Sequence, residues 1–137
     1  MEEKFALAIK AQNNAYAIYS NFKVGACVVL KDGNYIIGSN VENSSYGLTN
    51  CAERSALFAC YSNGYRKEDI LELIICTSNT IPSSPCGACR QVIYELMEKE
   101  AKVILINPEL VNTINLKVKE LLPLGFDGEK LNEKTSL

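Results

Sequence analysis

The chain contains no histidine among its 137 residues. Histidine is the commonest metal ligand in proteins and the side chain that most readily exchanges a proton near neutral pH. Its absence excludes catalysis by a histidine acid or base. A metal site must therefore be built from cysteine, aspartate or glutamate, and proton transfer must use another side chain.

The sequence also lacks runs of like charge and long apolar segments. Its 14 basic and 16 acidic residues give a net charge of −2 and a pI of about 5.2, whereas nucleic-acid-binding surfaces are usually strongly basic. No apolar stretch approaches the roughly 20 residues that span a bilayer. The first four residues, MEEK, are acidic where a secretory signal would be basic. We therefore expect a cytoplasmic protein that binds neither a nucleic acid polymer nor a membrane.

Six cysteines are present, and in the cytoplasm they are expected to stay reduced. Three of them lie within apolar strand or helix patterns, where a free cysteine behaves as a small hydrophobic side chain: Cys27, Cys60 and Cys76. We predict that these three belong to the core. The other three lie at the starts of predicted helices and are candidate metal ligands: Cys51, Cys86 and Cys89.

The length fits one domain over residues 1–137. Apolar spacing, turn residues and caps predict the element order. The predicted helices are 2–16, 50–62 and 85–100, and the predicted strands are 23–30, 35–41, 70–77 and 102–107, followed by a short strand at 111–116 and a helical turn at 121–122. Residues 131–137 are polar and are expected to fray or to serve in assembly.

The arrangement of these elements predicts an α/β layered domain. Strands 23–30 and 70–77 are almost continuously apolar, which indicates cover on both faces of the sheet. The unit from strand 70–77 through helix 85–100 to strand 102–107 implies a parallel pair with a right-handed crossover. The turn at 31–33 makes strand 35–41 antiparallel to the first strand, so the predicted sheet is mixed.

Residues 84–91, SPCGACRQ, form the strongest local motif. Its Ser-Pro pair is typical of an N-cap and a first helical residue, which would place Cys86 and Cys89 on one face of the first turn. A helix start favours thiolates, the form that binds metal. With Cys51 as third ligand, the fourth position of a tetrahedral zinc would stay open for water, as in catalytic zinc sites.

Two charged residues follow Cys51. A zinc ion with three thiolates carries net negative charge, and Arg54 could draw charge off the ligand sulfurs by hydrogen bonding. Glu53 could take a proton from the bound water. Alternatives remain: Glu53 could complete a capping box with Asn50, and Cys86 with Cys89 alone could be a redox pair.

Together, the Cys-Ala-Glu of residues 51–53 and the PCGAC of 85–89 match the motif of zinc-dependent nucleobase deaminases. More closely, the chain resembles the small homotetrameric cytidine deaminases. The stretches that carry the resemblance are 15–20, 21–26, 40–43, 50–56, 84–91 and 120–126, and they cover nearly the whole chain. One departure is Ile18, where the family commonly has proline, which would loosen the turn after the first helix.

The resemblance implies a three-layer α/β/α fold with a mixed five-stranded sheet, and one Zn²⁺ per chain on Cys51, Cys86 and Cys89. It assigns the proton shuttle to Glu53. It also implies five substrate contacts: Phe22 against the base, Asn40 and Glu42 to the ribose hydroxyls, the backbone amide of Ala52 to the pyrimidine carbonyl, and Phe126 entering the site of a neighbouring subunit.

The implied reaction is hydrolytic deamination of free cytidine and deoxycytidine to uridine and deoxyuridine with release of ammonia, as in pyrimidine salvage. The implied protein is a hydrolase whose active sites lie at the subunit interfaces of a homotetramer. Two alternatives stay open. The substrate could be another aminopyrimidine nucleoside such as blasticidin S, or the chain could be a non-catalytic zinc or redox module.

Overall fold

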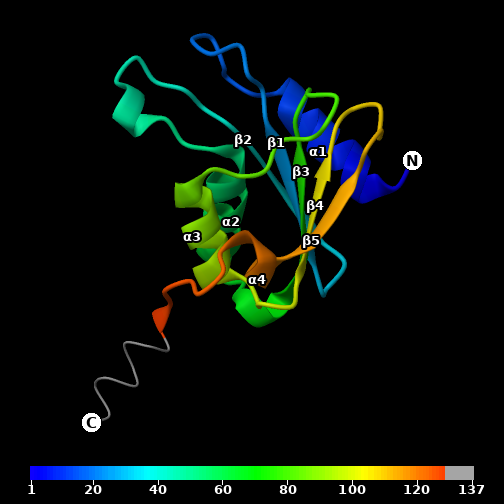
Figure 1. Cartoon of the computed structure of the whole chain (residues 1–137), viewed down its shortest axis with the longest axis vertical. Coiled ribbons are helices and arrows are strands. Elements are labelled where there is room, and N and C mark those ends of the chain that lie inside the picture. The colour runs from blue at the N-terminus through cyan, green and yellow to red at the C-terminus, as the bar shows by residue number, and fades with distance from the viewer. Residues whose placement is uncertain (129–137) are drawn as a thin grey trace.

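A computed structural model describes residues 1–128 of the chain (Figure 1). A five-stranded sheet forms its centre, in the order β2-β1-β3-β4-β5. Its strands are β1 (Gly25–Leu30), β2 (Tyr35–Ser39), β3 (Ile70–Cys76), β4 (Lys102–Ile106) and β5 (Ile114–Lys117). Only the β3–β4 pair is parallel, and the other neighbours pair antiparallel. The predicted mixed sheet with an antiparallel second strand is confirmed.

Helices cover both faces of this sheet (Figure 1). Helix α1 (Glu3–Asn13) packs on one face, and α2 (Ala52–Ser62), α3 (Gly87–Leu96) and the short α4 (Val118–Leu121) lie on the other. Two short 3-10 helices, η1 (Tyr46–Leu48) and η2 (Lys67–Asp69), flank α2 in the sequence. The predicted three-layer α/β/α architecture is therefore confirmed.

Two apolar cores explain the continuous hydrophobic runs in the inner strands. Val28 belongs to the core under α2 and α3, while its neighbour Cys27 faces the core under α1. Alternate side chains of a strand point to opposite faces, so a strand covered on both faces is apolar at every position. Cys27, Cys60 and Cys76 are all fully buried, as predicted.

Helix α2 lies unusually close to β2. A Cβ atom on Gly38 would come within 2.5 Å of the backbone nitrogen of Ala56 and 2.7 Å of the carbonyl oxygen of Ala52. Only glycine allows the two backbones to approach in this way. This contact fixes where the start of α2 lies above the sheet.

Several predicted element boundaries are wrong, because long-range hydrogen bonds and local backbone conformation end the elements. Helix α1 ends at Asn13 rather than at residue 16, since the Tyr16 amide donates to the Asn40 carbonyl at 2.9 Å. Strand β1 begins at Gly25 rather than at 23. Strand β5 begins at Ile114 rather than at 111, because Leu110 and Asn112 both have positive φ.

The helix starts also differ from the prediction. The N-cap of α3 is Cys86, not Ser84, and α3 ends at Leu96 rather than at 100. Helix α2 likewise has Cys51 as its N-cap. Cys51 and Cys86 are thus each the last extended residue before a helix. The polar segment 131–137 lies outside the described residues.

Candidate metal centre

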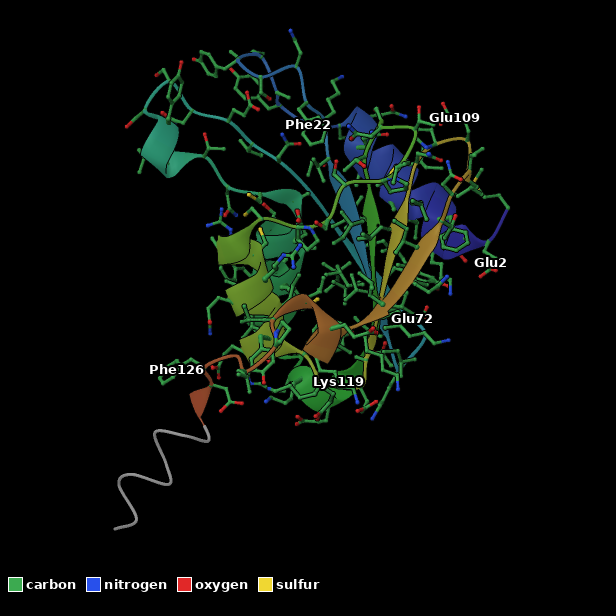
Figure 2. All side chains as sticks on the ribbon, viewed as in Figure 1. Glu2, Phe22, Glu72, Glu109, Lys119 and Phe126 are labelled. Atoms are coloured by element: carbon green, nitrogen blue, oxygen red, sulfur yellow. The ribbon has the colours of Figure 1, made fainter. Side chains whose placement is uncertain are left out.

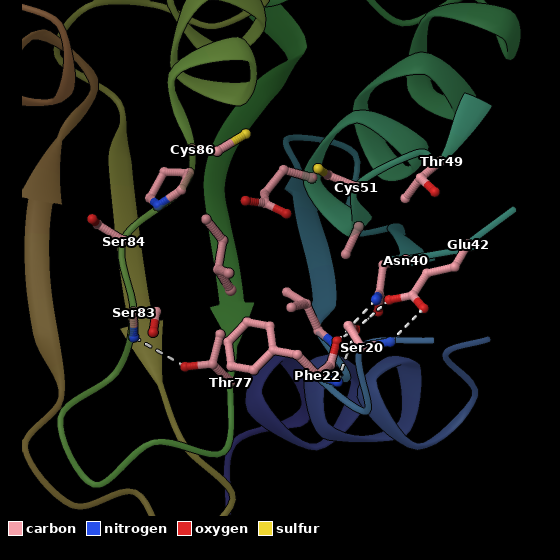
Figure 3. Close-up of a pocket in the computed structure, with 15 residues that line it drawn as sticks. Ser20, Phe22, Asn40, Glu42, Thr49, Cys51, Thr77, Ser83, Ser84 and Cys86 are labelled. Carbon is pink, nitrogen blue, oxygen red and sulfur yellow. Dashed lines mark hydrogen bonds between the residues drawn. The ribbon is translucent and has the colours of Figure 1, made fainter. Parts of the chain in front are cut away.

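The starts of α2 and α3 bring three cysteines together. The Sγ atoms of Cys51, Cys86 and Cys89 all lie within 4.8 Å of one another. Tetrahedral zinc with Zn–S bonds of 2.3 Å needs sulfurs about 3.8 Å apart, so small side-chain adjustments suffice. Thiolates are ligands that zinc prefers, and in Figure 3 the sulfurs of Cys51 and Cys86 lie above the same hollow. The donor set fits one zinc ion.

The cluster is already polarised towards thiolate at Cys51. The S–H of Cys89 and the guanidinium of Arg54 lower the pKa of Cys51 to about 5. The pKa of Cys89 is raised, because its proton is held by Cys51 and because the thiol is buried. These contacts favour the thiolate form of Cys51, and zinc binding would release the thiol protons that remain in the cluster.

Arg54 lies beside these sulfurs, as predicted. Its Nη2 donates to the Sγ of Cys51 at 3.1 Å. Hydrogen bonds and charge from Cys51 and Cys89 raise the pKa of Arg54. Its Nε is buried and has no partner among the described residues. The Nη2 end of the guanidinium is therefore directed at the cysteine cluster.

Glu53 is the buried carboxyl group of the site. Only 5% of its surface is exposed, and burial raises its pKa, with the charge of Cys51 adding to the effect. The capping-box alternative is wrong: the N-cap of α2 is Cys51, and the side-chain Nδ2 of Asn50 instead donates to the Ser55 hydroxyl at 3.0 Å. A capping box therefore does not explain why Glu53 is buried.

A cavity of about 300 Å³ opens below the cysteines (Figure 3). This volume is at the lower end of the range for small-molecule sites. Seven predicted site residues line it: Phe22, Asn40, Glu42, Cys51, Ala52, Glu53 and Cys86. Residues on four separate stretches of sequence thus meet around one hollow.

Two polar side chains that line the cavity, those of Asn40 and Glu42, hydrogen-bond to the loop of residues 19–24. The Oδ1 of Asn40 accepts from the Val24 amide at 2.8 Å, and its Nδ2 donates to the Phe22 carbonyl at 3.0 Å. The carboxylate of Glu42 accepts from the Tyr19 and Ser20 amides at 3.0 Å and from the Ser20 hydroxyl. These hydrogen bonds lower the pKa of Glu42. Contact with ribose stays a prediction for both residues.

The two predicted aromatic contacts lie far apart within one chain (Figure 2). Phe22 borders the cavity and is 41% exposed. Phe126 is 52% exposed and does not line the cavity, and its carbonyl accepts from Gln91 Nε2 at 2.9 Å. A single chain does not bring Phe126 to the site.

Several polar residues that line the cavity were missed by sequence reasoning: Ser20, Thr49, Thr77, Ser83 and Ser84. Thr77 follows β3 directly, and ligands collect at the carboxyl ends of parallel strands, so its position offered a usable signal. Its hydroxyl accepts from the Ser83 amide at 3.0 Å. The others lie in loops whose course only the tertiary structure defines.

Among residues 1–128, no helix is both long enough and apolar enough to cross a membrane.

Comparison with known proteins places the same residues in a family context. Residues 1–105 match the family model described as the cytidine and deoxycytidylate deaminase zinc-binding region. A cytidine deaminase of Halalkalibacterium halodurans is 48% identical over 126 residues, which is 92% of this chain and 93% of that protein.

Solved structures give the same result. The cytidine deaminase of Burkholderia pseudomallei superposes with a TM-score of 0.86 at 43% identity, covering 92% of this chain and 100% of that one. The cytidine deaminase of Mycobacterium tuberculosis gives a TM-score of 0.74 at 36% identity, covering 89% and 93% of the two chains.

Proposed function

The chain belongs to the cytidine and deoxycytidylate deaminase family, and from this premise we propose that it is a zinc-dependent hydrolase that deaminates free cytidine and deoxycytidine. The products are uridine or deoxyuridine and ammonia, as pyrimidine salvage requires. The observation that carries the proposal is the cluster of three cysteine sulfurs beside a buried glutamate at the edge of a cavity.

Cys51, Cys86 and Cys89 hold one zinc ion per chain. When bound, zinc supplies a Lewis acid that makes water a nucleophile near neutral pH. Arg54 donates to the Cys51 sulfur and so withdraws negative charge from the ligand set. This compensation matters because three negatively charged thiolates reduce the ability of zinc to acidify bound water. Neutral imidazole ligands would not reduce it in this way.

Glu53 moves the protons. It takes a proton from the attacking water, delivers it to ring N3, and later supplies a proton to the departing amino group as ammonia leaves. Burial raises its pKa, which suits a carboxyl group that must hold a proton between two transfers. Water is consumed and ammonia released, so no other reactant is needed.

The remaining predicted contacts orient the nucleoside in the cavity. Phe22 packs against the base, the Ala52 amide meets the pyrimidine carbonyl, and Asn40 and Glu42 bind the ribose hydroxyls. Their common position around one cavity supports these roles. The hydrogen bonds that lower the pKa of Glu42 favour its acceptor form at the cavity edge.

We further propose a homotetramer of one-domain chains in which Phe126 completes the site of a neighbouring subunit. Its exposure and its distance from the chain's own cavity support this assignment. A cytoplasmic location is proposed as well, because all six cysteines are free thiols and the proposed ligands must stay reduced to bind zinc.

The test combines metal analysis with an assay of cytidine turnover, followed as loss of ultraviolet absorbance. We expect one zinc per chain in the wild type and in Glu53→Gln, with turnover in the variant reduced about 10²–10⁴-fold. Glu98→Gln is the matched control, because Glu98 is exposed beyond the end of α3, and it should keep full activity.

Undiminished turnover by Glu53→Gln would rule out the proton shuttle. A wild type with a tightly bound zinc but no turnover of cytidine would leave only two alternatives: another aminopyrimidine nucleoside as the substrate, or a non-catalytic module. Competition between cytidine and blasticidin S separates the substrates. A reversible Cys86–Cys89 disulfide without turnover would support the redox module.

A further inference from the structure

The guanidinium of Arg90 grips the loop that leads into Cys86. Its Nε donates to the Pro85 carbonyl at 2.8 Å, and its Nη2 donates to the Ser84 hydroxyl at 2.8 Å. Its Nη1 reaches across to the Leu121 carbonyl of α4 at 2.9 Å. All three guanidinium nitrogens of Arg90 thus donate to neutral oxygen atoms, and these oxygens belong to two separate segments of the chain.

This grip acts on the peptide plane beside the proposed ligand. The Pro85 carbonyl and the Cys86 nitrogen belong to the same rigid peptide group. On the other side of Cys86, its carbonyl accepts from the Arg90 amide at 2.9 Å. Side chain and main chain of Arg90 therefore fix the backbone both before and after Cys86, and with it the direction of the Cα–Cβ bond.

Cys86 needs such support because it is the most exposed of the three proposed ligands. It is exposed, whereas Cys89 is fully buried within α3. As N-cap of α3, Cys86 has extended dihedrals and no side-chain cap hydrogen bond. Packing therefore does little to hold its Sγ, yet metal–ligand distances tolerate only about 0.2 Å of variation.

We propose that Arg90 is a positioning residue that holds Cys86 in the geometry that zinc requires. The inference rests on the proposed function, in which Cys86 is a zinc ligand. Arg90 differs from Arg54 in its target, since Arg54 contacts a ligand sulfur and Arg90 contacts the backbone that presents one. Through Leu121, Arg90 also ties this loop to α4.

Lysine cannot replace arginine here. A single ammonium on a flexible stem lacks the planar fork that reaches three separated acceptors at once. Glutamine has two donors but is too short to span them. Removal of the fork also leaves the buried Pro85 with an unpaired carbonyl, so that the loop can rotate away from the metal.

The experiment measures transfer of zinc from the holoenzyme to a chromophoric chelator, for wild type, Arg90→Lys and Arg90→Gln. We expect the zinc affinity of both variants to fall about 10–100-fold, as is typical when a residue that orients a ligand is lost. Co²⁺-substituted protein gives a second readout, because the visible absorption of cobalt reports ligand geometry.

The matched control is Arg66→Gln. Arg66 also donates to two main-chain carbonyls, those of Tyr61 and Tyr65 at 3.2 and 2.7 Å, but beyond the far end of α2. Because Arg66 is exposed, the variant should lose less stability than the Arg90 variants and keep wild-type zinc transfer. All transfer rates are measured at the same number of degrees below each variant's own Tm, so that a general loss of stability does not affect the comparison.

Should the Arg90 variants fail to fold, Ser84→Ala removes one acceptor at an exposed position, and zinc transfer should be about twofold to fivefold faster. Wild-type transfer rates and cobalt spectra in the folded variants, or equal acceleration in Arg66→Gln, would overturn the inference. A wild type that binds no zinc would instead overturn the proposed function.

Discussion

Asn40 illustrates how one side chain at the cavity serves the backbone. Both ends of its amide are used on the main chain of the loop that carries Phe22, and the residue is only 7% exposed. The donor and acceptor assignments follow from these partners, since an amide N–H must face a carbonyl and a carbonyl must face an N–H. Asn40 therefore sets the position of Phe22 whether or not it also meets ribose.

We expect Asn40→Asp to lower the free energy of unfolding by about 1–3 kcal/mol, because the Phe22 carbonyl loses its donor and faces a carboxylate. The KM for cytidine should rise as Phe22 shifts. Urea unfolding and steady-state kinetics measure the two effects.

Asn63→Asp is the matched control for this change. The Nδ2 of Asn63 also donates to a main-chain carbonyl, that of Ala59 at 2.8 Å, but at an exposed position. The variant should lose less than about 0.5 kcal/mol and keep the wild-type KM. Equal losses in the two variants would contradict the role assigned to Asn40.

At the scale of elements, the site depends on how closely α2 approaches β2. The start of α2 carries Cys51, Glu53 and Arg54, and Gly38 in β2 lies directly beneath its first turns. Helix α3, which presents the other two cysteines, packs against α2. A shift of α2 would therefore move one ligand relative to the other two.

Gly38→Ala should consequently impair both stability and metal binding. The added methyl would lie 2.5 Å from the Ala56 nitrogen and 2.7 Å from the Ala52 carbonyl oxygen, and these backbone atoms cannot yield as a flexible side chain does. We expect a loss of about 1–3 kcal/mol in unfolding free energy, together with weaker zinc retention on dialysis.

Gly47→Ala is the comparison for that variant, because a Cβ atom there would meet nothing within 4 Å. It should retain zinc and melt near the wild-type temperature. If Gly38→Ala behaved in the same way, the close approach would not be what sets the ligand spacing.

At the scale of the whole molecule, the chain's own cavity and its Phe126 are separate (Figure 2). If the tetramer joins them, each active site combines Glu53 of one subunit with Phe126 of another. Such a shared site makes activity a property of the assembly rather than of the chain.

Mixing two inactive variants tests this arrangement. Glu53→Gln and Phe126→Ala should each be weakly active alone, while co-refolded mixtures should regain activity at about one quarter of their sites, where intact Glu53 and intact Phe126 meet. The measurements are turnover against mixing ratio and mass by light scattering. A mixture no more active than its components would contradict a shared site.

The chemistry of this protein could be predicted from its sequence because it depends on residue types and short spacings. The absence of histidine, the C-x-x-C pair and the Cys-Ala-Glu triplet are local facts, and the apolar periods that predicted a mixed α/β sheet are local as well. Element boundaries were less predictable, since distant partners end the elements, as Asn40 does for α1 through its contact with Tyr16.

The sequence alone thus determined which groups are available, three thiols and one carboxyl group near helix starts, because helix and strand preferences act over a few residues. Only the tertiary structure decided that Cys51 meets Cys86 and Cys89, that Asn40 and Glu42 hold the loop around Phe22, and that Arg90 braces the loop before Cys86. Those contacts join segments far apart in the chain, and their geometry arises from the packing of helices on the sheet, which no local pattern encodes.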